Sequence, residues 1–469
     1  MKGCLNKRQL EYILFHLEFT VNINQQIIER LSFEFDSTSS TCDSPMPLIK
    51  FKLSEKSLNL NNVISIDNIP VLFPNSNKDR FYYFKNNNLI FEHDILKSAF
   101  YLLSGFQELH EKEKDHYNRF PFEKSLQYKL NFIDKPIVNY YFEIIARGIK
   151  EFCLIHNIPF ERGKISDNFI FILSHDIDLI NNYNYYEVGN KFKQAFGLSK
   201  TIFNKRKSIK IFINYLINWL NPFNKKNPYW CFDKLLEIEN ENNISATYFF
   251  LDQDQKHQDS YYKFTDDRIR NLIKHLETNN AEIGLHGTIR SANSVDAMKL
   301  TLSNLQSVAK QKIVGVRQHT LRYKHPDTIK IQEVVGIKYD TTLGFAAHEG
   351  FRNSYCLPFK LYDFKKDRML NVWEFPLIVM DGTLFGYRNL NYKEATESII
   401  KLIDEVIKFN GIFTLLWHNS FFEEILFPGI EDFYKKLLKE ITNMQPLSIS
   451  GRELLEIINR FSYNKKSYF

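Results

Sequence analysis

The sequence predicts an α/β protein: a distorted (β/α) barrel of about seven strands, preceded by a smaller α+β domain. Three observations lead to this fold class. The chain has 469 residues, which is too long for one ordinary domain. In its second part, apolar runs typical of buried strands alternate with segments of helical spacing, as in parallel sheets joined by crossover helices. Most of these runs end in a polar residue, and barrel enzymes carry their chemistry at such strand ends.

Residues 1–156 are predicted to form the α+β domain. Apolar residues have helical spacing from Gln9 to His16, and Ile28 to Asp36 is typical of a strand. Two short apolar runs flank an Asn-rich turn between residues 81 and 91, which predicts a hairpin. Asp94 can cap a helix that extends to Leu109. No catalytic set is recognisable in this part of the sequence.

The second domain, residues 167–469, opens with the apolar run Phe169 to Leu173, which suits a strand buried on both faces. Ser174-His-Asp-Ile-Asp178 follows it. Since side chains alternate along a strand, Asp176 and Asp178 point to one face. Two carboxylates so close together need a cation, a shared proton or unequal pKa values, and a metal ion is the simplest solution. The alternative is a pair of solvated aspartates at a strand end.

A basic insertion, at about residues 181–227, follows the opening strand. From Gly189 to Pro228 there are nine Lys or Arg residues and no Asp or Glu, interleaved with aromatic and aliphatic residues. A basic amphipathic helix of this kind can lie on an anionic membrane surface, which predicts peripheral membrane contact. The alternative is a helical excursion that packs its apolar face on the body of the protein.

Beyond the insertion, predicted helices and strands alternate regularly. Predicted strands follow the helical segments at residues 246–251, 282–286, 313–319, 337–340 and 412–417, with another strand at 371–380. Together with the opening strand they make about seven. This number favours a closed or nearly closed barrel over an open sheet.

Polar residues at the ends of these strands should converge in such a barrel. They comprise carboxylates, imidazoles and one guanidinium: Asp176, Asp178, His286, Arg317, His319, Asp340, Asp381 and His418. Carboxylates and histidines at successive strand ends are the residue types of a metal site with acid and base groups. Each histidine alone could be structural, but their shared location predicts a functional site.

Five segments, in order, carry a resemblance to a known family. They are Ser174-His-Asp-Ile-Asp178, Glu282-Ile-Gly-Leu-His286, Gly315-Val-Arg317, Tyr339-Asp-Thr-Thr342 and Leu416-Trp-His418. This series resembles the motifs of the NodB-type polysaccharide deacetylases, the carbohydrate esterase family four group, over about Phe169 to Phe427. The N-terminal part, through Phe100-Tyr-Leu-Leu103 and Arg119-Phe-Pro121, resembles an uncharacterised domain often found ahead of such deacetylase-like domains.

The resemblance implies a distorted (β/α) barrel and a divalent metal ion, usually zinc, held by one Asp and two His. It also implies hydrolysis of an N-acetyl group on a sugar. By motif position, Asp176 is the general base, Asp178 and His286 are metal ligands, and His418 is the general acid. Arg317 orients the base. A bound metal polarises the acetyl carbonyl and lowers the pKa of its water, so the residue types suit the reaction.

One position departs from the family pattern. Where the second motif usually has another histidine, this chain has Arg290, which cannot bind a metal. Either the metal site is then empty, or His319 supplies the missing imidazole. His175 is a poorer substitute, because side chains alternate along the strand and His175 points to the face opposite Asp176 and Asp178. Asp340, Asp381 and Arg290 are the candidates for substrate contact.

Two functions are compatible with the sequence. One is a cytoplasmic, metal-dependent deacetylase of an amino sugar in a glycan or glycan precursor. The other is an inactive barrel that binds glycan or a protein partner. The net charge of +6 is small for this length and does not indicate nucleic-acid binding. Five scattered cysteines without a C-x-x-C pair indicate reduced thiols, and the apolar runs stay below the ~20 residues of a membrane span.

Overall fold

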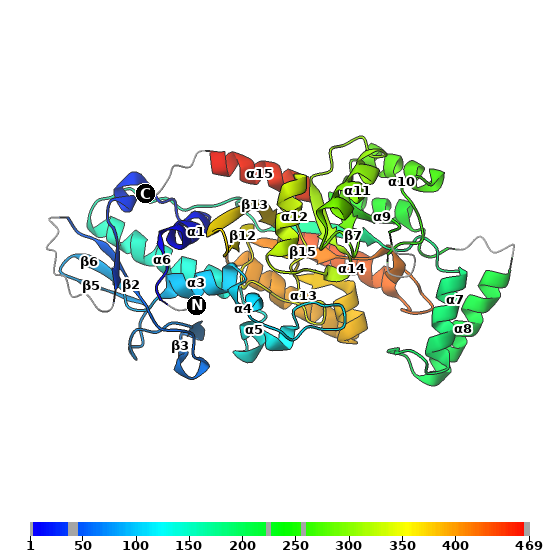
Figure 1. The fold of residues 1–469 in the computed structure, drawn as a ribbon, viewed down its shortest axis with the longest axis horizontal. Coiled ribbons are helices and arrows are strands. Elements are labelled where there is room, and N and C mark those ends of the chain that lie inside the picture. Colours follow the sequence, from blue (N-terminus) through cyan, green and yellow to red (C-terminus); the bar gives the residue numbers. More distant parts are fainter. Residues whose placement is uncertain (1–2, 36–45, 222–226, 255–258, 464–469) are drawn as a thin grey trace.

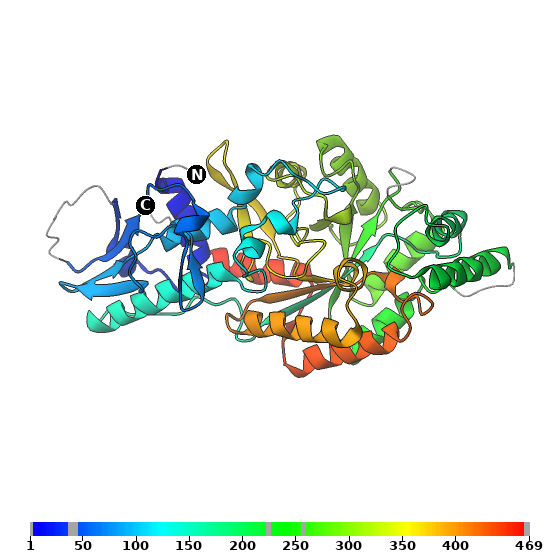
Figure 2. The same ribbon diagram turned by 90° about the horizontal axis from the view of Figure 1, so that it is seen from below.

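The computed structural model describes residues 3–35, 46–221, 227–254 and 259–463. The molecule is elongated, with the N-terminal region at one end and helices α7 (Tyr185–Ala195) and α8 (Lys205–Leu220) at the other (Figure 1). A curled sheet lies between them, and its crossover helices lie around its outside (Figure 2).

The large sheet has ten strands in the order β12-β13-β11-β10-β9-β8-β7-β15-β14, with β16 also paired to β7. Neighbouring strands are parallel except β12 and β13. The strands are β7 (Ile170–Ile177), β8 (Ala246–Leu251), β9 (Glu282–Gly287), β10 (Gly315–Gln318), β11 (Tyr339–Asp340), β12 (Phe359–Asp363), β13 (Arg368–Glu374), β14 (Val379–Met380), β15 (Ile412–Leu416) and β16 (Leu447–Ser448).

The crossover helices follow the predicted alternation. They are α9 (Phe232–Glu241), α10 (Asp267–Thr278), α11 (Val295–Gln306), α12 (Asp327–Val335) and α13 (Tyr392–Ile407). Two helices beyond the predicted series follow, α14 (Ile430–Asn443) before β16 and α15 (Gly451–Tyr463) after it. The short helical turns η3 (His319–Leu321), η4 (Gly382–Tyr387) and η5 (Asn419–Phe421) come after strands β10, β14 and β15. These three turns follow strand ends, and they place backbone and side chains around the same edge of the sheet.

The curled sheet agrees with the predicted closed or nearly closed barrel in outline, but the predicted number of about seven strands needs correction. The single strand predicted at 371–380 is two strands, because β13 ends at Glu374 beside β11 and β14 begins at Val379 beside β15. Pro376 lies between them and has no backbone N–H to continue a ladder. Within the described chain no ladder joins β13 to β14, so the sheet is curled but open at this point.

The N-terminal region contains helices and a four-stranded sheet of order β1-β2-β6-β5. Its elements are α1 (Lys7–Leu17), α2 (Gln25–Ile28), β1 (Leu31–Phe35), β2 (Ile49–Leu53), η1 (Leu60–Asn62), β3 (Ile64–Ile66), β4 (Ile69–Val71), β5 (Tyr82–Lys85), β6 (Asn88–Phe91), α3 (Ile95–Leu103), α4 (Phe106–Leu109), η2 (Phe122–Lys124), α5 (Leu126–Lys129) and α6 (Ile137–Ile155). The predicted hairpin is confirmed as β5 and β6, joined by Asn86 and Asn87 at φ values of 49° and 64°.

The helix predicted from Asp94 to Leu109 is two helices. Asp94 caps α3 as predicted, through its carboxylate and the backbone N–H of Lys97. However, Gly105 has a left-handed φ of 74°, which ends α3 and turns the chain into α4.

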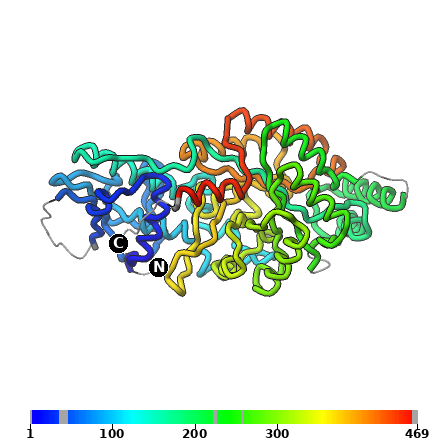
Figure 3. The backbone as a smooth tube through the Cα atoms, turned by 90° about the horizontal axis from the view of Figure 1, so that it is seen from above, coloured from blue at the N-terminus to red at the C-terminus, as the bar shows by residue number. Residues whose placement is uncertain are grey.

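The N-terminal region and the large sheet share a continuous hydrophobic core. The Tyr12 ring of α1 lies 5.3 Å from the ring of Tyr362 in β12. Arg352 and Glu108 form a buried, two-pronged ion pair with N–O distances of 2.8 and 2.7 Å. Helix α15 also reaches back toward this region (Figure 3). Its residue Phe461 stacks on Phe19. The predicted division at residue 156 stays a prediction, but this packing allows the N-terminal region to contribute to a site in the sheet.

Cys153, Cys231 and Cys356 are free thiols, and Cys42 lies outside the described residues. Among the helices that the structure describes, none combines the length and the apolar character needed to cross a bilayer.

Candidate active site

Five of the predicted strand-end residues meet in one cavity at the carboxyl edge of the sheet: Asp176, Asp178, His286, His319 and His418. It has a volume of about 380 Å³. Its polar wall comes from strand ends β7, β9, β10 and β15, and its other walls come from the following turns and from the N-terminal region. The lining residues are Tyr117, Arg119, Asp176, Asp178, His286, His319, Thr320, Leu321, Met380, Gly382, Tyr387, His418, Ser420 and Phe421. This size lies within the range of small-molecule sites.

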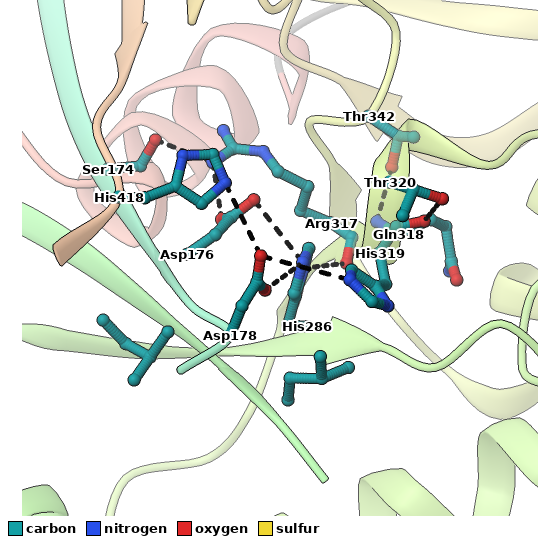
Figure 4. A network of polar contacts seen from close by, with 12 residues as sticks. Ser174, Asp176, Asp178, His286, Arg317, Gln318, His319, Thr320, Thr342 and His418 are labelled. Carbon is teal, nitrogen blue, oxygen red and sulfur yellow. Dashed lines mark hydrogen bonds and ion pairs between the residues drawn. The ribbon is translucent and has the colours of Figure 1, made fainter. Parts of the chain in front are cut away.

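Three of these side chains form a group that can hold a metal ion. The ligand atoms of Asp178, His286 and His319 all lie within 4.8 Å of one another. Oδ1 of Asp178 is 3.2 Å from Nε2 of His286, and Oδ2 is 4.0 Å from Nε2 of His319 (Figure 4). Oδ1 of Asp178 is buried and has no hydrogen bond of acceptable geometry. A buried carboxylate oxygen without a hydrogen bond, facing two imidazole nitrogens, fits a cation.

The far sides of both imidazoles are anchored. Nδ1 of His286 lies 2.9 Å from the carbonyl oxygen of Arg317, and Nδ1 of His319 lies 3.1 Å from Oδ1 of Asp259. Both acceptors require a proton on Nδ1, so Nε2, on the side of Asp178, is the atom of each ring that can bind a metal ion. Metal-binding histidines are oriented by such contacts, and a carboxylate behind the ring also makes it a better donor. The arrangement therefore fits a divalent metal ion bound by one Asp and two His.

Asp176 lies beside this group, on the same face of β7 as Asp178. Its Oδ1 accepts a hydrogen bond of 2.9 Å from Nη1 of Arg317. Its Oδ2 lies 3.6 Å from Nε2 of His286. Arg317 is fully buried and is itself held by Ser174 Oγ and the carbonyl oxygen of Thr341, at 2.9 and 3.0 Å. One oxygen of Asp176 is thus fixed by a cation, and the other faces the cavity.

His418 lies across the cavity from β9, after the end of β15. Its Nδ1 is 2.7 Å from Oδ1 of Asp381, and its Nε2 is 3.7 Å from Oδ2 of Asp178. Burial lowers the pKa of His418, but the adjacent Asp381 carboxylate outweighs this effect and raises the pKa to about 10. His418 is therefore an imidazolium at neutral pH, and its Nε2–H points into the cavity.

The charged groups of the cluster shift one another's pKa values. Burial raises the pKa of Asp178, but the neighbouring imidazoles of His319, His286 and His418 lower it well below its usual value. Burial lowers the pKa of His286, and the carboxylates of Asp176 and Asp178 raise it overall. The ligand-type carboxylate is consequently ionised, as a metal ligand must be.

The structure does not bring three predicted substrate contacts to the cavity lining. Asp340 is fully buried and accepts hydrogen bonds from Gln332 and Thr342. Asp381 is also fully buried, behind His418, so it orients that ring. The side chain of Arg290 is 57% exposed and pairs with Asp254 at 2.8 Å outside the lining. Sequence position placed Asp340 and Asp381 at strand ends and Arg290 four residues after His286, but burial and local pairing direct their side chains elsewhere.

Two lining residues from the N-terminal region were not among the predicted site residues. Arg119 donates to the carbonyl oxygen of Thr320 and to the hydroxyl of Tyr387, both at 2.9 Å. Nε of Arg119 donates a hydrogen bond of 2.7 Å to Oδ2 of Asp115, and its guanidinium lies 4.7 Å from the ring of Tyr117. Arg119-Phe-Pro121 was noted only as part of a resemblance, and no sequence pattern links it to strand ends some two hundred residues away. Asp259 was missed as well, because it lies in a connection rather than at a strand end.

Comparisons with known proteins give one family match, in the N-terminal region. Residues 6–153 match a protein-family model described as a family of unknown function, DUF7033. A search of curated proteins finds no match to the chain.

Three solved structures illustrate the structural similarity. A probable polysaccharide deacetylase from Pseudomonas aeruginosa PAO1 shares 13% identity over 63% of this chain and 93% of its own, with a TM-score of 0.42. A mutant peptidoglycan deacetylase from Bacillus subtilis shares 11% identity over 63% and 93%, with a TM-score of 0.31. A CE4 family pseudoenzyme from Bacillus anthracis shares 10% identity over 62% and 66%, with a TM-score of 0.31.

Proposed function

We propose that the chain is a metal-dependent hydrolase that removes N-acetyl groups from an amino sugar of a polysaccharide or glycan precursor. The observation that carries the proposal is the composite site. Asp178, His286 and His319 face one point, and Asp176 and His418 flank it with opposite charge. A site that only binds sugar has little use for both a fixed carboxylate and a fixed imidazolium.

Asp178, His286 and His319 would hold the divalent ion, and zinc suits this ligand set. When bound, the ion polarises the acyl carbonyl and lowers the pKa of a water molecule. His319 replaces the histidine that Arg290 displaces from the family pattern. This replacement removes the main reason for the alternative, an inactive barrel that binds glycan or a protein partner.

The protein's own groups account for the proton transfers. The free Oδ2 of Asp176 takes a proton from the attacking water, while Arg317 holds Oδ1 and keeps the carboxylate in place. The Nε2–H of His418 is donated to the departing amine nitrogen as its bond to the acyl carbon breaks. Asp381 keeps the His418 ring in the orientation that this donation requires. Acetate and the free amino sugar are the products.

Aromatic side chains on the cavity lining suit a sugar substrate. Tyr117 and Tyr387 are 39% and 44% exposed, and Phe421 lies on the same lining. Flat aromatic faces can cover the C–H face of a pyranose ring, while the polar strand ends meet its acetamido group. The proposal therefore places the sugar between the turns and the N-terminal region.

The direct test is acetate release. Zinc-loaded full-length protein is expected to release acetate from N-acetylated oligosaccharides or nucleotide-linked amino sugars, and chelation followed by removal of zinc is expected to stop it. Metal analysis and sugar binding are measured on the same samples. If the protein binds metal and sugar but releases no acetate from a broad panel, the binding alternative replaces the hydrolase.

Arg119 provides a second test, because it fixes the cavity wall without contacting the metal group. Arg119→Ala frees Tyr387 and the carbonyl of Thr320, and it leaves Asp115 without its ion pair. We expect kcat/KM for deacetylation to fall by about tenfold, as for a lost hydrogen bond to a charged group. Metal content should stay the same. Arg270→Ala, which removes an exposed arginine of α10, is the matched control. Equal kcat/KM for both variants would exclude Arg119 from the site.

A further inference from the structure

The hairpin of α7 and α8 exposes an unusual amount of apolar surface. Residues 185–220 carry ten of the 21 large hydrophobic side chains that are exposed in the described part of the chain. They are Tyr185, Tyr186, Phe192, Phe196, Leu198, Ile202, Ile213, Ile217, Trp219 and Leu220. The hairpin lies at the end of the molecule opposite the N-terminal region, so a large partner can reach it (Figure 1).

The two helices run antiparallel. Tyr185 at the start of α7 lies 6.3 Å from Trp219 at the end of α8, and Phe192 lies 5.5 Å from Phe212, between ring centroids. The inner face of the hairpin is covered, because Val188, Ile211 and Tyr215 form a buried cluster with Leu426. The alternative to membrane contact, a helical excursion that packs its apolar face on the body of the protein, therefore accounts only for the inner face of the hairpin.

The outer face of α8 has an ordered pattern. Arg206, Lys210, Ile213, Ile217 and Leu220 are all exposed and follow one another at spacings of four and three residues. Residues with these spacings lie on one side of a helix. The stripe begins with cations at the helix start and becomes apolar toward the helix end. The stripe therefore has a charged end and an apolar end, and no described segment of the chain covers it.

Apart from the buried Glu187 in the first turn of α7, the charged side chains of the hairpin are all basic. Between residues 189 and 221 there are seven Lys or Arg residues and no Asp or Glu. Lys191 is only half-buried against the ring of Tyr215, and Lys207 donates to the carbonyl oxygen of Leu426. The other five are exposed: Lys193, Lys200, Lys205, Arg206 and Lys210. Apolar side chains beside uncompensated cations match the surface of an anionic bilayer, where headgroups lie next to acyl chains.

The hairpin is also tied to the edge of the sheet that carries the cavity. It follows the segment after Asp178, in which Asn182 donates a hydrogen bond of 2.6 Å to Glu423. Lys207 of α8 donates a hydrogen bond of 3.2 Å to the carbonyl oxygen of Leu426, in the segment after His418. Tyr186 stacks on Tyr261 with centroids 4.6 Å apart. A surface that binds this hairpin therefore lies near the mouth of the site.

We propose that the α7–α8 hairpin docks the protein on an anionic membrane surface. The exposed aromatic and aliphatic side chains enter the interface, and the lysines and Arg206 face the anionic headgroups. This inference rests on the exposed residues of the hairpin and is independent of the reaction in the cavity.

Co-sedimentation of full-length protein with vesicles tests the proposal. We expect binding to vesicles of phosphatidylcholine with phosphatidylserine, weak binding to phosphatidylcholine alone, and loss of binding as salt rises. Lys205→Gln combined with Arg206→Gln and Lys210→Gln should lower the partition coefficient by about 100-fold. Ile213→Ser combined with Ile217→Ser and Leu220→Ser should lower it at least as strongly.

Two matched sets separate this effect from general changes in surface chemistry. Leu300→Ser with Val334→Ser removes exposed apolar side chains elsewhere, and Lys274→Gln with Lys299→Gln removes exposed charges elsewhere; both should bind like wild type. Thermal unfolding of all variants should match wild type, because the changed side chains are exposed. Equal recovery of wild type in the supernatant with both vesicle types overturns the proposal. A second result also overturns it: the wild type binds no vesicles but self-associates in sedimentation velocity, and the hairpin variants abolish this self-association. A second copy of the chain, rather than a membrane, then covers the hairpin.

Discussion

Replacing Asp178 with Asn should abolish tight metal binding, and acetate release should disappear with it. Asp178 is the only anionic member of the group with His286 and His319. The amide keeps the size of the side chain but removes the charge that balances a divalent cation. Metal content of the purified variant, measured by plasma emission spectrometry, should fall to background while wild type retains about one ion per chain.

A variant next to the metal ligands should weaken metal binding without abolishing it. Asp259→Asn leaves the three ligands in place and removes only the carboxylate behind His319. Contacts of that kind are worth about 10- to 100-fold in metal affinity, so this variant should still bind, more weakly, in a calorimetric titration. Asp254→Asn, which changes a neighbouring carboxylate paired with Arg290, is the control. Full metal content in Asp178→Asn would place the ion elsewhere or remove it from the mechanism.

Local periodicity predicted much of the site. Alternation along β7 placed Asp176 and Asp178 on one face and His175 on the other, where His175 indeed contacts Glu239 at 2.8 Å. The strand-end rule brought His286 and Arg317 together, and they are register partners in β9 and β10. These features depend on spacing within a strand and on the common direction of parallel strands, and both can be read from sequence.

Features that depend on tertiary packing were not accessible in this way. Asp381 follows an apolar run like the other strand-end acids, but the tight turn η4 and burial direct it toward His418 rather than into the cavity. Arg119 reaches Thr320 only because the N-terminal region shares a core with the sheet. The split of β13 from β14 was similarly hidden, since the sequence is apolar from Phe375 to Met380 on both sides of Pro376 and only strand pairing separates the two strands.

Removing the base or the acid should lower turnover without removing the metal. Asp176→Asn keeps the size of the side chain and its contact with Arg317 but cannot accept the proton of water. His418→Ala removes the Nε2–H that protonates the leaving amine. Each group should contribute about 10²- to 10⁴-fold to kcat, the usual range for one acid or base. Acetate release under saturating substrate measures this, and metal analysis confirms that Asp178, His286 and His319 still bind the ion.

Variants of Asp381 and His418, alone and combined, test whether the His418 imidazolium takes part in the reaction or only supports the structure. If His418 donates the proton and Asp381 only orients it, Asp381→Asn should reduce kcat less than His418→Ala does. In the double variant, the loss of Asp381 should add almost nothing, because a residue that acts through another has no effect once that residue is gone. Additive losses in this cycle would give Asp381 a direct role in the reaction. Turnover of Asp176→Asn and His418→Ala at the wild-type rate would show that the assigned acid and base are wrong, even for a protein that releases acetate.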